Sequence, residues 1–339
     1  MRLPLLLADA RPENLSIFDP VSPPAESIRT LAALVLAITG AIFLIVEGVL
    51  LYSIYRFRRR AGQAAGEPPQ VYGSNPIEIA WTAAPALISF ILFLVTARTI
   101  WEVRVNPDAP PPGARPLRVT VVGHQWWWEY VYDNYDGRDL GVITANELHV
   151  PASDLAVSGG RRPTYLALQS ADVAHSFWVP RLAGKTDLIP GKTNTMWFET
   201  DRRQLFLGQC AEFCGTQHAN MLLRVQVDSP EDFERWLENE GKPAVEDPAA
   251  AEGKAAFLAQ SCVNCHRVRG TAARGNYAPD LTHLMSRKTL AAGMRPNTPE
   301  ELRRWVADPQ KIKPGCLMPA FKLSDRDLDL VVGYLLTLK

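Results

Sequence analysis

The sequence predicts a multidomain protein with a transmembrane two-helix hairpin, an all-β domain and an all-α domain, in that order. Two long apolar segments lie in the first hundred residues, short alternating segments follow, and helix-forming segments without strand alternation complete the chain. A length of 339 residues allows two or three domains. Because 36 Lys and Arg balance 36 Asp and Glu, the composition excludes the chain-wide basic surface typical of nucleic-acid partners.

The N-terminal part predicts a helical hairpin in a membrane over residues 28–104. Ile28–Tyr55 and Ile79–Ala97 are each long enough to supply the roughly 20 apolar residues that cross a bilayer. Glu47 is the one ionisable residue in the core of the first segment. A pair of buried helices in a soluble protein is the alternative, and two such segments in succession disfavour it.

Charge predicts the orientation of this hairpin. Four arginines among residues 56–60 follow the first apolar segment, and an arginine-rich loop beside a membrane helix stays in the cytoplasm. Both ends of the hairpin then lie on the outer, periplasmic side of a bacterial-type cell membrane. Residues 1–27 are an outer N-terminal segment or the remnant of a signal sequence, and their apolar run is shorter than a usual signal core.

The soluble part divides into two predicted domains joined by a linker. Residues 105–239 open with a Pro-rich spacer and then alternate apolar and polar residues in short stretches, which predicts a β-sandwich or barrel. Ser229-Pro230 has the signature of a helix start. Residues 240–250 are polar and contain prolines, which predicts a linker, and residues 251–339 form the helical domain. The alternating stretches are Leu117–Val122, Thr164–Leu168, Thr195–Glu199 and Leu222–Val227.

A cluster of metal-ligating residue types lies in the loop before the last predicted strand. Residues 210–221 contain two cysteines, one histidine and one methionine, and His175 follows an earlier strand. Thiolate and thioether ligands together with imidazoles favour copper. A Cys2His2 zinc site and a disulfide between Cys210 and Cys214 stay open, although zinc leaves Met221 unexplained and a disulfide leaves both histidines unexplained.

A second motif predicts covalently attached haem. Cys262-Val-Asn-Cys265-His266 is the pattern in which two cysteines form thioethers to the porphyrin and the histidine binds the iron. A thioredoxin-like motif or half of a zinc ribbon is the alternative, but the second cysteine pair and a βαβ pattern are missing. The sixth iron ligand is expected to be a methionine, and Met318, followed by Pro319, is the candidate.

The stretches GHQWWWEY, DVAHSFWVPRLAGKTDLIPGKTN and GQCAEFCGTQHANM resemble subunit II of the haem-copper cytochrome c oxidases. The resemblance covers residues 16 to about 228 and implies a cupredoxin-like domain with a dinuclear copper (CuA) centre. The segment around Met318 resembles the small class I cytochromes c, in which a Met-Pro element supplies the distal haem ligand. Together these resemblances imply a caa-type oxidase subunit with a fused cytochrome c domain.

The resemblance also implies roles for individual residues. Cys210 and Cys214 would bridge both coppers, His175 and His218 would each bind one, and Met221 and the Glu212 carbonyl would complete the set. The Glu212 carboxylate would bind magnesium at the contact with subunit I.

The same resemblance assigns electron entry to the aromatic cluster, and we expect Trp126 to lie between donor and copper. It further implies a proton-uptake role for Glu78 at the start of the second helix, whereas an interfacial carboxylate without such a role is the plain alternative.

The sequence thus predicts the electron-entry subunit of a proton-pumping terminal oxidase. Subunit I would reduce oxygen to water, subunit III and an external cytochrome c or another donor are further expected partners, and the chain itself has too few histidines for an oxygen-reducing site. The equivalent subunit of a copper-containing nitric oxide reductase is the nearest alternative. A membrane-anchored copper carrier or redox sensor is an alternative of another class.

Overall fold

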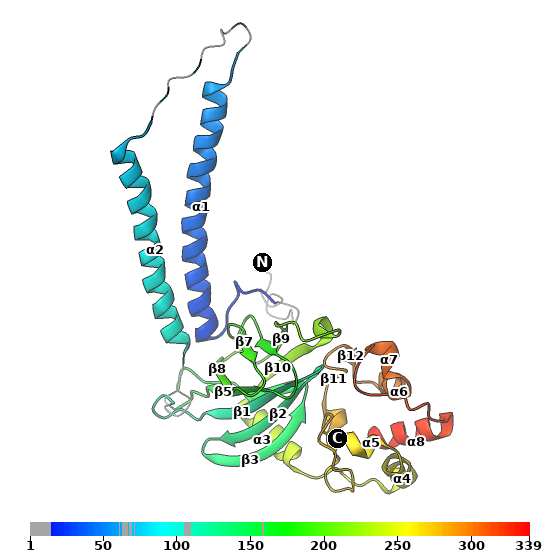
Figure 1. Ribbon diagram of the computed structural model, residues 1–339. Helices are drawn as coiled ribbons and strands as arrows, with labels where there is room; N and C mark the ends of the chain where they lie inside the picture. Colours follow the sequence, from blue (N-terminus) through cyan, green and yellow to red (C-terminus); the bar gives the residue numbers. More distant parts are fainter. Residues whose placement is uncertain are drawn as a thin grey trace, which may run out of the picture. The chain divides into compact units, whose positions relative to one another are not determined.

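The computed structural model describes residues 15–60, 62, 67, 70, 72–104, 110–157 and 159–339. The chain separates into two compact units, of which one is formed by residues 26–104 and the other contains the remaining residues (Figure 1). The signal-like residues 1–10 and residues 105–109, at the start of the Pro-rich spacer, lie outside the described residues.

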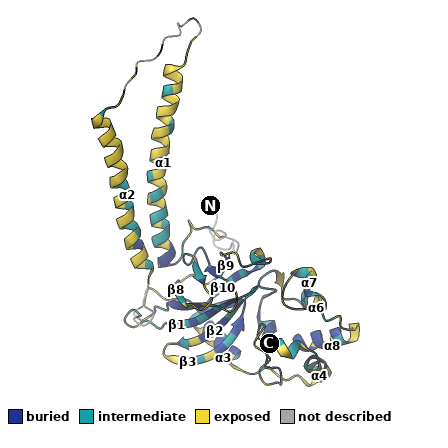
Figure 2. Ribbon diagram, viewed as in Figure 1, coloured by how far each residue is buried: buried dark blue, intermediate teal, exposed yellow. Residues whose placement is uncertain are grey.

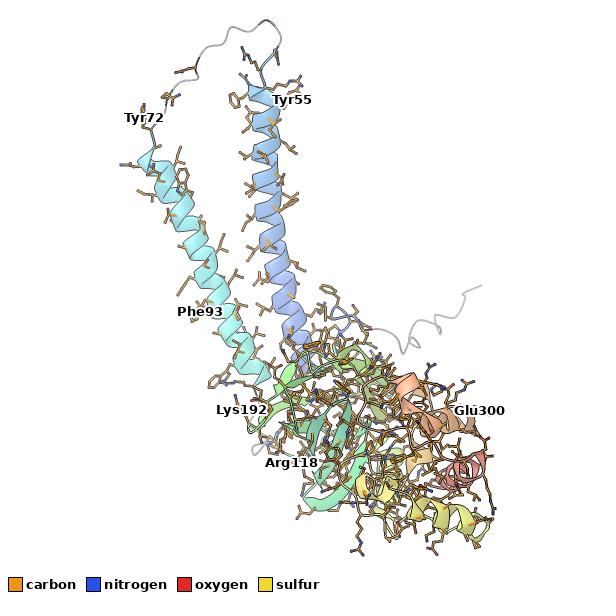
Figure 3. All side chains as sticks on the ribbon, turned by 45° about the vertical axis from the view of Figure 1, so that its right-hand side comes forward. Tyr55, Tyr72, Phe93, Arg118, Lys192 and Glu300 are labelled. Carbon is orange, nitrogen blue, oxygen red and sulfur yellow. The ribbon has the colours of Figure 1, made fainter. Side chains whose placement is uncertain are left out.

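The first unit consists of two long helices, α1 (Pro23–Phe57) and α2 (Asn75–Val103). Both are long and apolar enough to cross a membrane, and none of their apolar window is buried inside the protein. Figure 2 shows exposed residues along most of both helices, and Figure 3 shows side chains such as Phe93 pointing away from the helix axis. Apolar side chains exposed all round a helix need an apolar solvent, which agrees with the predicted spans.

The all-β domain packs two five-stranded sheets against each other, as the alternating stretches predict. One sheet has the order β3-β2-β1-β5-β8 and the other β4-β10-β9-β6-β7. Pairs β1·β5 and β4·β10 are parallel and the remaining pairs antiparallel. The strands are β1 (Leu117–His124), β2 (Trp127–Tyr135), β3 (Arg138–Ala145), β4 (Glu147–Pro151), β5 (Thr164–Ser170), β6 (His175–Trp178), β7 (Thr186–Leu188), β8 (Asn194–Phe198), β9 (Leu205–Cys210) and β10 (Leu222–Asp228).

Alternation along the strands builds the core between the sheets. In β1 and β10 every second side chain is buried, because successive residues of a strand point to opposite faces. Trp128, Phe177 and Phe206 are among the large side chains that fill this core. After β10, Ser229 accepts a hydrogen bond from Asp232 N and caps α3 (Pro230–Gly241), as its Ser-Pro start predicts.

The C-terminal domain is helical and has its own core around Phe257, Leu302 and Leu335. Contacts between α4 and α8 hold the two ends of this domain together. Two strands of two residues each, too short to leave an alternating pattern, are the part that the sequence did not predict. The elements are η2 (Pro248–Ala250), α4 (Ala251–Ala259), α5 (Cys262–Cys265), η3 (Leu284–Ser286), β11 (Thr289–Leu290), β12 (Arg295–Pro296), α6 (Pro299–Ala307), α7 (Pro309–Ile312) and α8 (Asp325–Leu335).

Candidate metal centre and haem cavity

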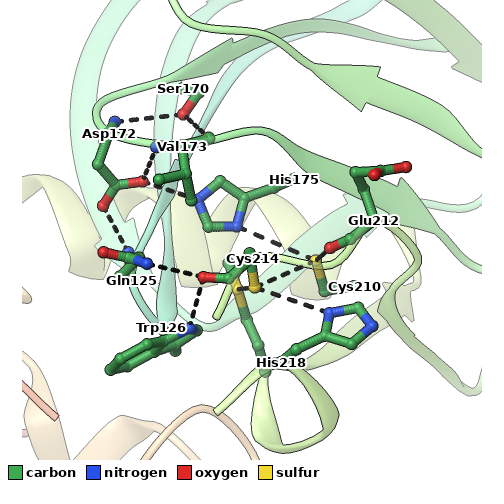
Figure 4. Close-up of polar contacts among 11 residues, drawn as sticks. Gln125, Trp126, Ser170, Asp172, Val173, His175, Cys210, Glu212, Cys214 and His218 are labelled. Carbon is green, nitrogen blue, oxygen red and sulfur yellow. Dashed lines mark hydrogen bonds and ion pairs between the residues drawn. The ribbon is translucent and has the colours of Figure 1, made fainter. Parts of the chain in front are cut away.

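The copper motif forms a compact cluster at one end of the β-sandwich (Figure 4). Cys210 ends β9, and the loop that follows carries Cys214 and the short 3-10 helix η1 (His218–Asn220) before β10 begins. His175 begins β6, which pairs with β9, so the sheet brings this distant histidine to the loop. Ligand atoms of His175, Cys210 and Cys214 lie within 4.8 Å of one another, and all three residues are buried.

The distances in this cluster suit ligand atoms of a shared metal centre. The two Sγ atoms are 3.8 Å apart, His175 Nδ1 lies 4.0 Å from Cys210 Sγ, and His218 Nδ1 lies 3.7 Å from Cys214 Sγ. Metal–sulfur and metal–nitrogen bonds of about 2.3 and 2.0 Å in a tetrahedral site put neighbouring ligand atoms roughly 3.5 Å apart. Both cysteines are free thiols. The residues therefore fit a metal centre with one histidine beside each sulfur.

Two weaker donors complete the set. Met221 Sδ lies 3.9 Å from Cys214 Sγ, and the Glu212 carbonyl oxygen lies 3.2 Å from Cys210 Sγ. Met221 is fully buried, whereas the Glu212 side chain is exposed. The backbone of Glu212 thus faces the sulfurs while its carboxylate points away from them, as Figure 4 shows.

The two thiols influence each other's ionisation. The hydrogen bond with Cys214 is the largest cause that lowers the pKa of Cys210, to about 3, and the same bond raises the pKa of Cys214. Metal binding would have to displace the thiol protons of the pair, as thiolate ligation requires.

Asp172 fixes the orientation of His175. Its Oδ1 accepts a hydrogen bond of 2.8 Å from His175 Nε2, which leaves Nδ1 facing Cys210. Burial raises the pKa of Asp172. Hydrogen bonds from His175, Gln125 N and Val173 N lower it by more than burial raises it, so the net pKa is lowered and the carboxylate stays ionised. A carboxylate behind a metal-binding histidine holds its tautomer and raises its basicity.

Two glycines make room for this arrangement. A Cβ on Gly123 would lie 2.7 Å from the His175 ring, so any side chain there would displace the ring. Gly215 has φ of +116° and lies against Gln125 and Trp126. These two side chains both donate hydrogen bonds to the Cys214 carbonyl, at 2.7 Å from Gln125 Nε2 and 3.0 Å from Trp126 Nε1.

The haem motif lines a cavity in the helical domain. Cys262, Cys265 and His266 are on its wall together with Met318, whereas Met285 and Met294 are not among the lining residues. His266 Nδ1 lies 2.7 Å from the Pro279 carbonyl, so its Nε2 is left for a ligand. Most of the remaining lining is apolar.

The cavity also contains a buried cation that suits haem. Arg287 is 8% exposed, and its Nε atom has no hydrogen-bond partner among the described residues. A buried guanidinium needs an anionic partner, and the propionates of a haem would supply one. The donor set, the apolar wall and the unpaired Arg287 Nε together fit a c-type haem.

Residues of the β-domain close one side of this cavity. Gln125, Trp126, Trp127 and Asn146 lie on the same wall as the haem motif. Trp126 therefore lies on the wall of the haem cavity, while its indole nitrogen donates a hydrogen bond to the carbonyl of Cys214 in the metal cluster.

Comparison with known proteins agrees with these sites. Residues 10–98 match the family described as cytochrome c oxidase subunit II, transmembrane domain, residues 117–228 match its periplasmic domain, and residues 250–339 match cytochrome c. Cytochrome c oxidase subunit 2 of Alkalihalophilus pseudofirmus is 33% identical to the chain, over 96% of the chain and 92% of the relative. The chain belongs to the cytochrome c oxidase subunit 2 family.

The chain is also similar to a second relative and to a solved structure. Cytochrome c oxidase subunit 2 of Bacillus subtilis is 30% identical over 99% of the chain and 95% of the relative. Among solved structures, the periplasmic domain of subunit II of cytochrome oxidase from Bradyrhizobium japonicum is 28% identical and covers 37% of this chain and 92% of that one, with a TM-score of 0.32. The three expected parts, membrane helices, cupredoxin-like domain and cytochrome c domain, are thus confirmed, and copper and haem binding are expected from the families.

Other residues singled out in this oxidase subunit have structural partners. Glu78 is exposed on the first turn of α2, where its Oε1 accepts a hydrogen bond of 3.4 Å from Ser74 N. Cys316 is half-buried on the cavity wall, where its Sγ accepts a bond from Gln310 Nε2. His124 stacks on Trp127.

Sequence reasoning missed several residues that the subunit uses around its sites. Asp172 stood in the quoted motif without a role, and its position three residues before His175 is the one signal it offered. Arg287 gave no signal, and neither did Lys313 and Glu147, which are described below. Each of them contacts residues, or lines a cavity, that only folding brings close to it.

Proposed function

We propose that this chain is the electron-entry subunit of a proton-pumping terminal oxidase, in which electrons pass from its own haem to its CuA centre and on to haem in subunit I. Oxygen would be reduced to water in subunit I. Membership of the oxidase subunit 2 family and the fused cytochrome c domain support this proposal. When bound, the haem and the two coppers would supply one-electron carriers.

The position of Trp126 carries the proposal. Trp126 lines the haem cavity and its Nε1–H donates to the Cys214 carbonyl, so one buried residue lies beside both cofactor sites. Trp127 also lines the cavity, but its ring stacks on His124, with ring centroids 4.1 Å apart. Trp126 is therefore the tryptophan we assign to the electron path.

The chain's residues hold these cofactors in fixed positions. Asp172 orients His175, Pro279 orients His266, and the paired sheets fix the loop between β9 and β10. Rigid ligands limit the change of geometry that accompanies each electron transfer. The proposed ligands are Cys210, Cys214, His175, His218, Met221 and the Glu212 carbonyl for copper, and Cys262, Cys265, His266 and Met318 for haem.

The proposed setting is a bacterial-type cell membrane with both soluble domains on the periplasmic side. The arginines at residues 56–60 support this orientation of the two-helix anchor. Subunit III, an external cytochrome c, a magnesium ion at the exposed Glu212 carboxylate and a proton-uptake role for Glu78 remain predictions. Because Glu78 accepts a hydrogen bond from Ser74 N, it also satisfies a backbone donor at the start of α2, a structural role that does not require proton uptake.

Purification of the complex in mild detergent tests the proposal. We expect a c-type haem band beside the haem of subunit I, at least two coppers per chain, a mixed-valence copper EPR signal and oxygen uptake. Nitric oxide consumption without oxygen uptake would favour the reductase alternative, and labile copper without a stable large partner would favour a carrier.

Two tryptophan variants test the electron path. Trp126→Phe keeps an aromatic ring but removes the donor to Cys214, and we expect slower haem-to-copper transfer with unchanged copper and iron content. Trp127→Phe is the matched control, because Trp127 also borders the cavity but stacks on His124. Equal rates in the two variants would contradict the assignment of Trp126.

A further inference from the structure

A lysine of the cytochrome c domain is buried against the all-β domain of residues 105–239, called the copper domain below. Lys313 lies between α7 and Met318 in the chain and is 2% exposed. Its Nζ donates hydrogen bonds to three backbone carbonyls, those of Trp126 at 2.8 Å, Asn220 at 2.9 Å and Ala291 at 3.1 Å. The first two belong to the copper domain, and the third belongs to the lysine's own domain.

These three bonds use the full donor capacity of an ammonium group. Burying a charged group is costly unless hydrogen bonds satisfy it, so this geometry strongly favours one position of the side chain. Burial lowers the pKa of Lys313 to about 8, which leaves the group charged at neutral pH with all its N–H donors present. Lys313 therefore connects the two domains at a defined point.

That point lies beside both cofactor sites. Asn220 precedes Met221 in the copper loop, and Trp126 is the residue that borders the haem cavity and donates to Cys214. Lys313 also lines the haem cavity and precedes Met318 by five residues. One side chain thus touches the copper loop, the tryptophan of the electron path and the segment that carries the distal haem ligand candidate.

A buried carboxylate makes the reciprocal contact from the copper domain. Glu147 is 5% exposed and accepts hydrogen bonds from Lys288 N, at 2.9 Å, and from Thr289 Oγ1, at 2.6 Å. A backbone bond from Leu222 N to Ala292 O, of 3.2 Å, joins the domains between these two anchors. At these two anchors, a buried ionisable side chain from each domain therefore satisfies polar groups of the other domain.

We propose that Lys313 is a positioning residue that docks the haem domain on the copper domain, with Glu147 as the second anchor, so that the internal donor is held at Trp126. This inference rests on the proposed electron-entry function. The alternative is a haem domain that moves on a flexible linker. In that case the linker only raises the effective concentration of the donor near the copper domain. A docked donor needs no encounter before each transfer.

The test uses the purified oxidase complex with full-length chain. Lys313→Met keeps most of the side-chain volume but removes all three donors, and Lys311→Met is the matched control because Lys311 is two residues away and exposed. Amide hydrogen exchange of residues 217–222 and 288–293 reports docking directly. Flash reduction of the haem followed by copper absorbance reports internal electron transfer.

We expect Lys313→Met to raise the exchange rates of both segments and to slow internal transfer at least about tenfold, which corresponds to 1.4 kcal/mol in docking. Haem and copper spectra and metal content stay as in the wild type. We expect Lys311→Met to behave like the wild type. Unchanged exchange and unchanged transfer in Lys313→Met would overturn the proposal, and so would faster exchange without slower transfer.

Glu147→Gln provides a second variant if Lys313→Met fails to fold. It keeps an acceptor but removes the charge, and we expect faster exchange of residues 288–293 with both cofactors retained. Failure of the wild type to transfer electrons between its cofactors would refute the electron-entry function instead. In that case hydrogen exchange still tests docking by Lys313, so the two failures are distinguishable.

Discussion

The carboxylate behind His175 gives the sharpest quantitative prediction. Replacing Asp172 by Asn removes a charge that accepts hydrogen bonds from His175 Nε2, Gln125 N and Val173 N, at 2.8, 2.6 and 2.6 Å. Loss of a carboxylate behind a metal-binding histidine typically costs 10–100-fold in metal affinity. A hydrogen bond to a charged group contributes about 1.5–3 kcal/mol, and this free energy corresponds to nearly the same range of affinity loss. We therefore expect copper affinity to fall roughly 10–100-fold.

Competition with a copper chelator, followed by the copper EPR signal, measures this loss. Asp154→Asn is the matched control, because Asp154 also accepts a backbone bond in a loop of the same domain, from Ala156 N, but lies outside the metal cluster. A change of less than threefold in Asp172→Asn would refute the argument that this carboxylate orients His175. An equal loss in the control would show that the effect comes from the fold.

Three further predictions follow from residues described above. Cys214→Ser should abolish the copper EPR signal and leave the haem band, whereas a normal copper signal would contradict the ligand assignment. Burial lowers the pKa of His124 to about 4, so the folded state resists protonation of a group that titrates near 6.5 when unfolded, and stability is lost as pH falls from 6.5 to 4, by up to about 3 kcal/mol. His124→Asn should therefore lose less thermal stability than the wild type between pH 7 and pH 4.5, and equal losses would refute this cause. Ser229→Ala should cost about 1 kcal/mol in the free energy of unfolding, and Ser229→Asp, which can also cap α3, should restore most of it.

The sequence predicted those parts of the molecule whose information is local. The copper loop places four candidate ligand residues within residues 210–221, and the haem motif occupies residues 262–266, so residue type and spacing were enough. The strands were predictable because one buried face leaves an alternating pattern. His175 was a candidate by residue type, but only the pairing of β6 with β9 brings it to the loop.

The contacts between domains could not be predicted because they join residues that are far apart in the sequence. Lys313 is 187 positions from Trp126, and Glu147 is 141 positions from Lys288. The residue type of a lysine or glutamate does not reveal whether its side chain is buried or exposed. Residues 240–250, predicted as a linker, contain the end of α3 and the 3-10 helix η2, and Glu240 is buried, where it accepts a bond from Ser286.

The shared wall of the haem cavity has a consequence for how the molecule matures. Haem is a wide, rigid disc, and its bonds to Cys262 and Cys265 must form while the cavity is still open. Gln125, Trp126 and Trp127 close that opening from the neighbouring domain. We therefore expect cofactor attachment to precede closure during biogenesis, and alkylation of both cysteines in newly made chains should be fast before haem arrives.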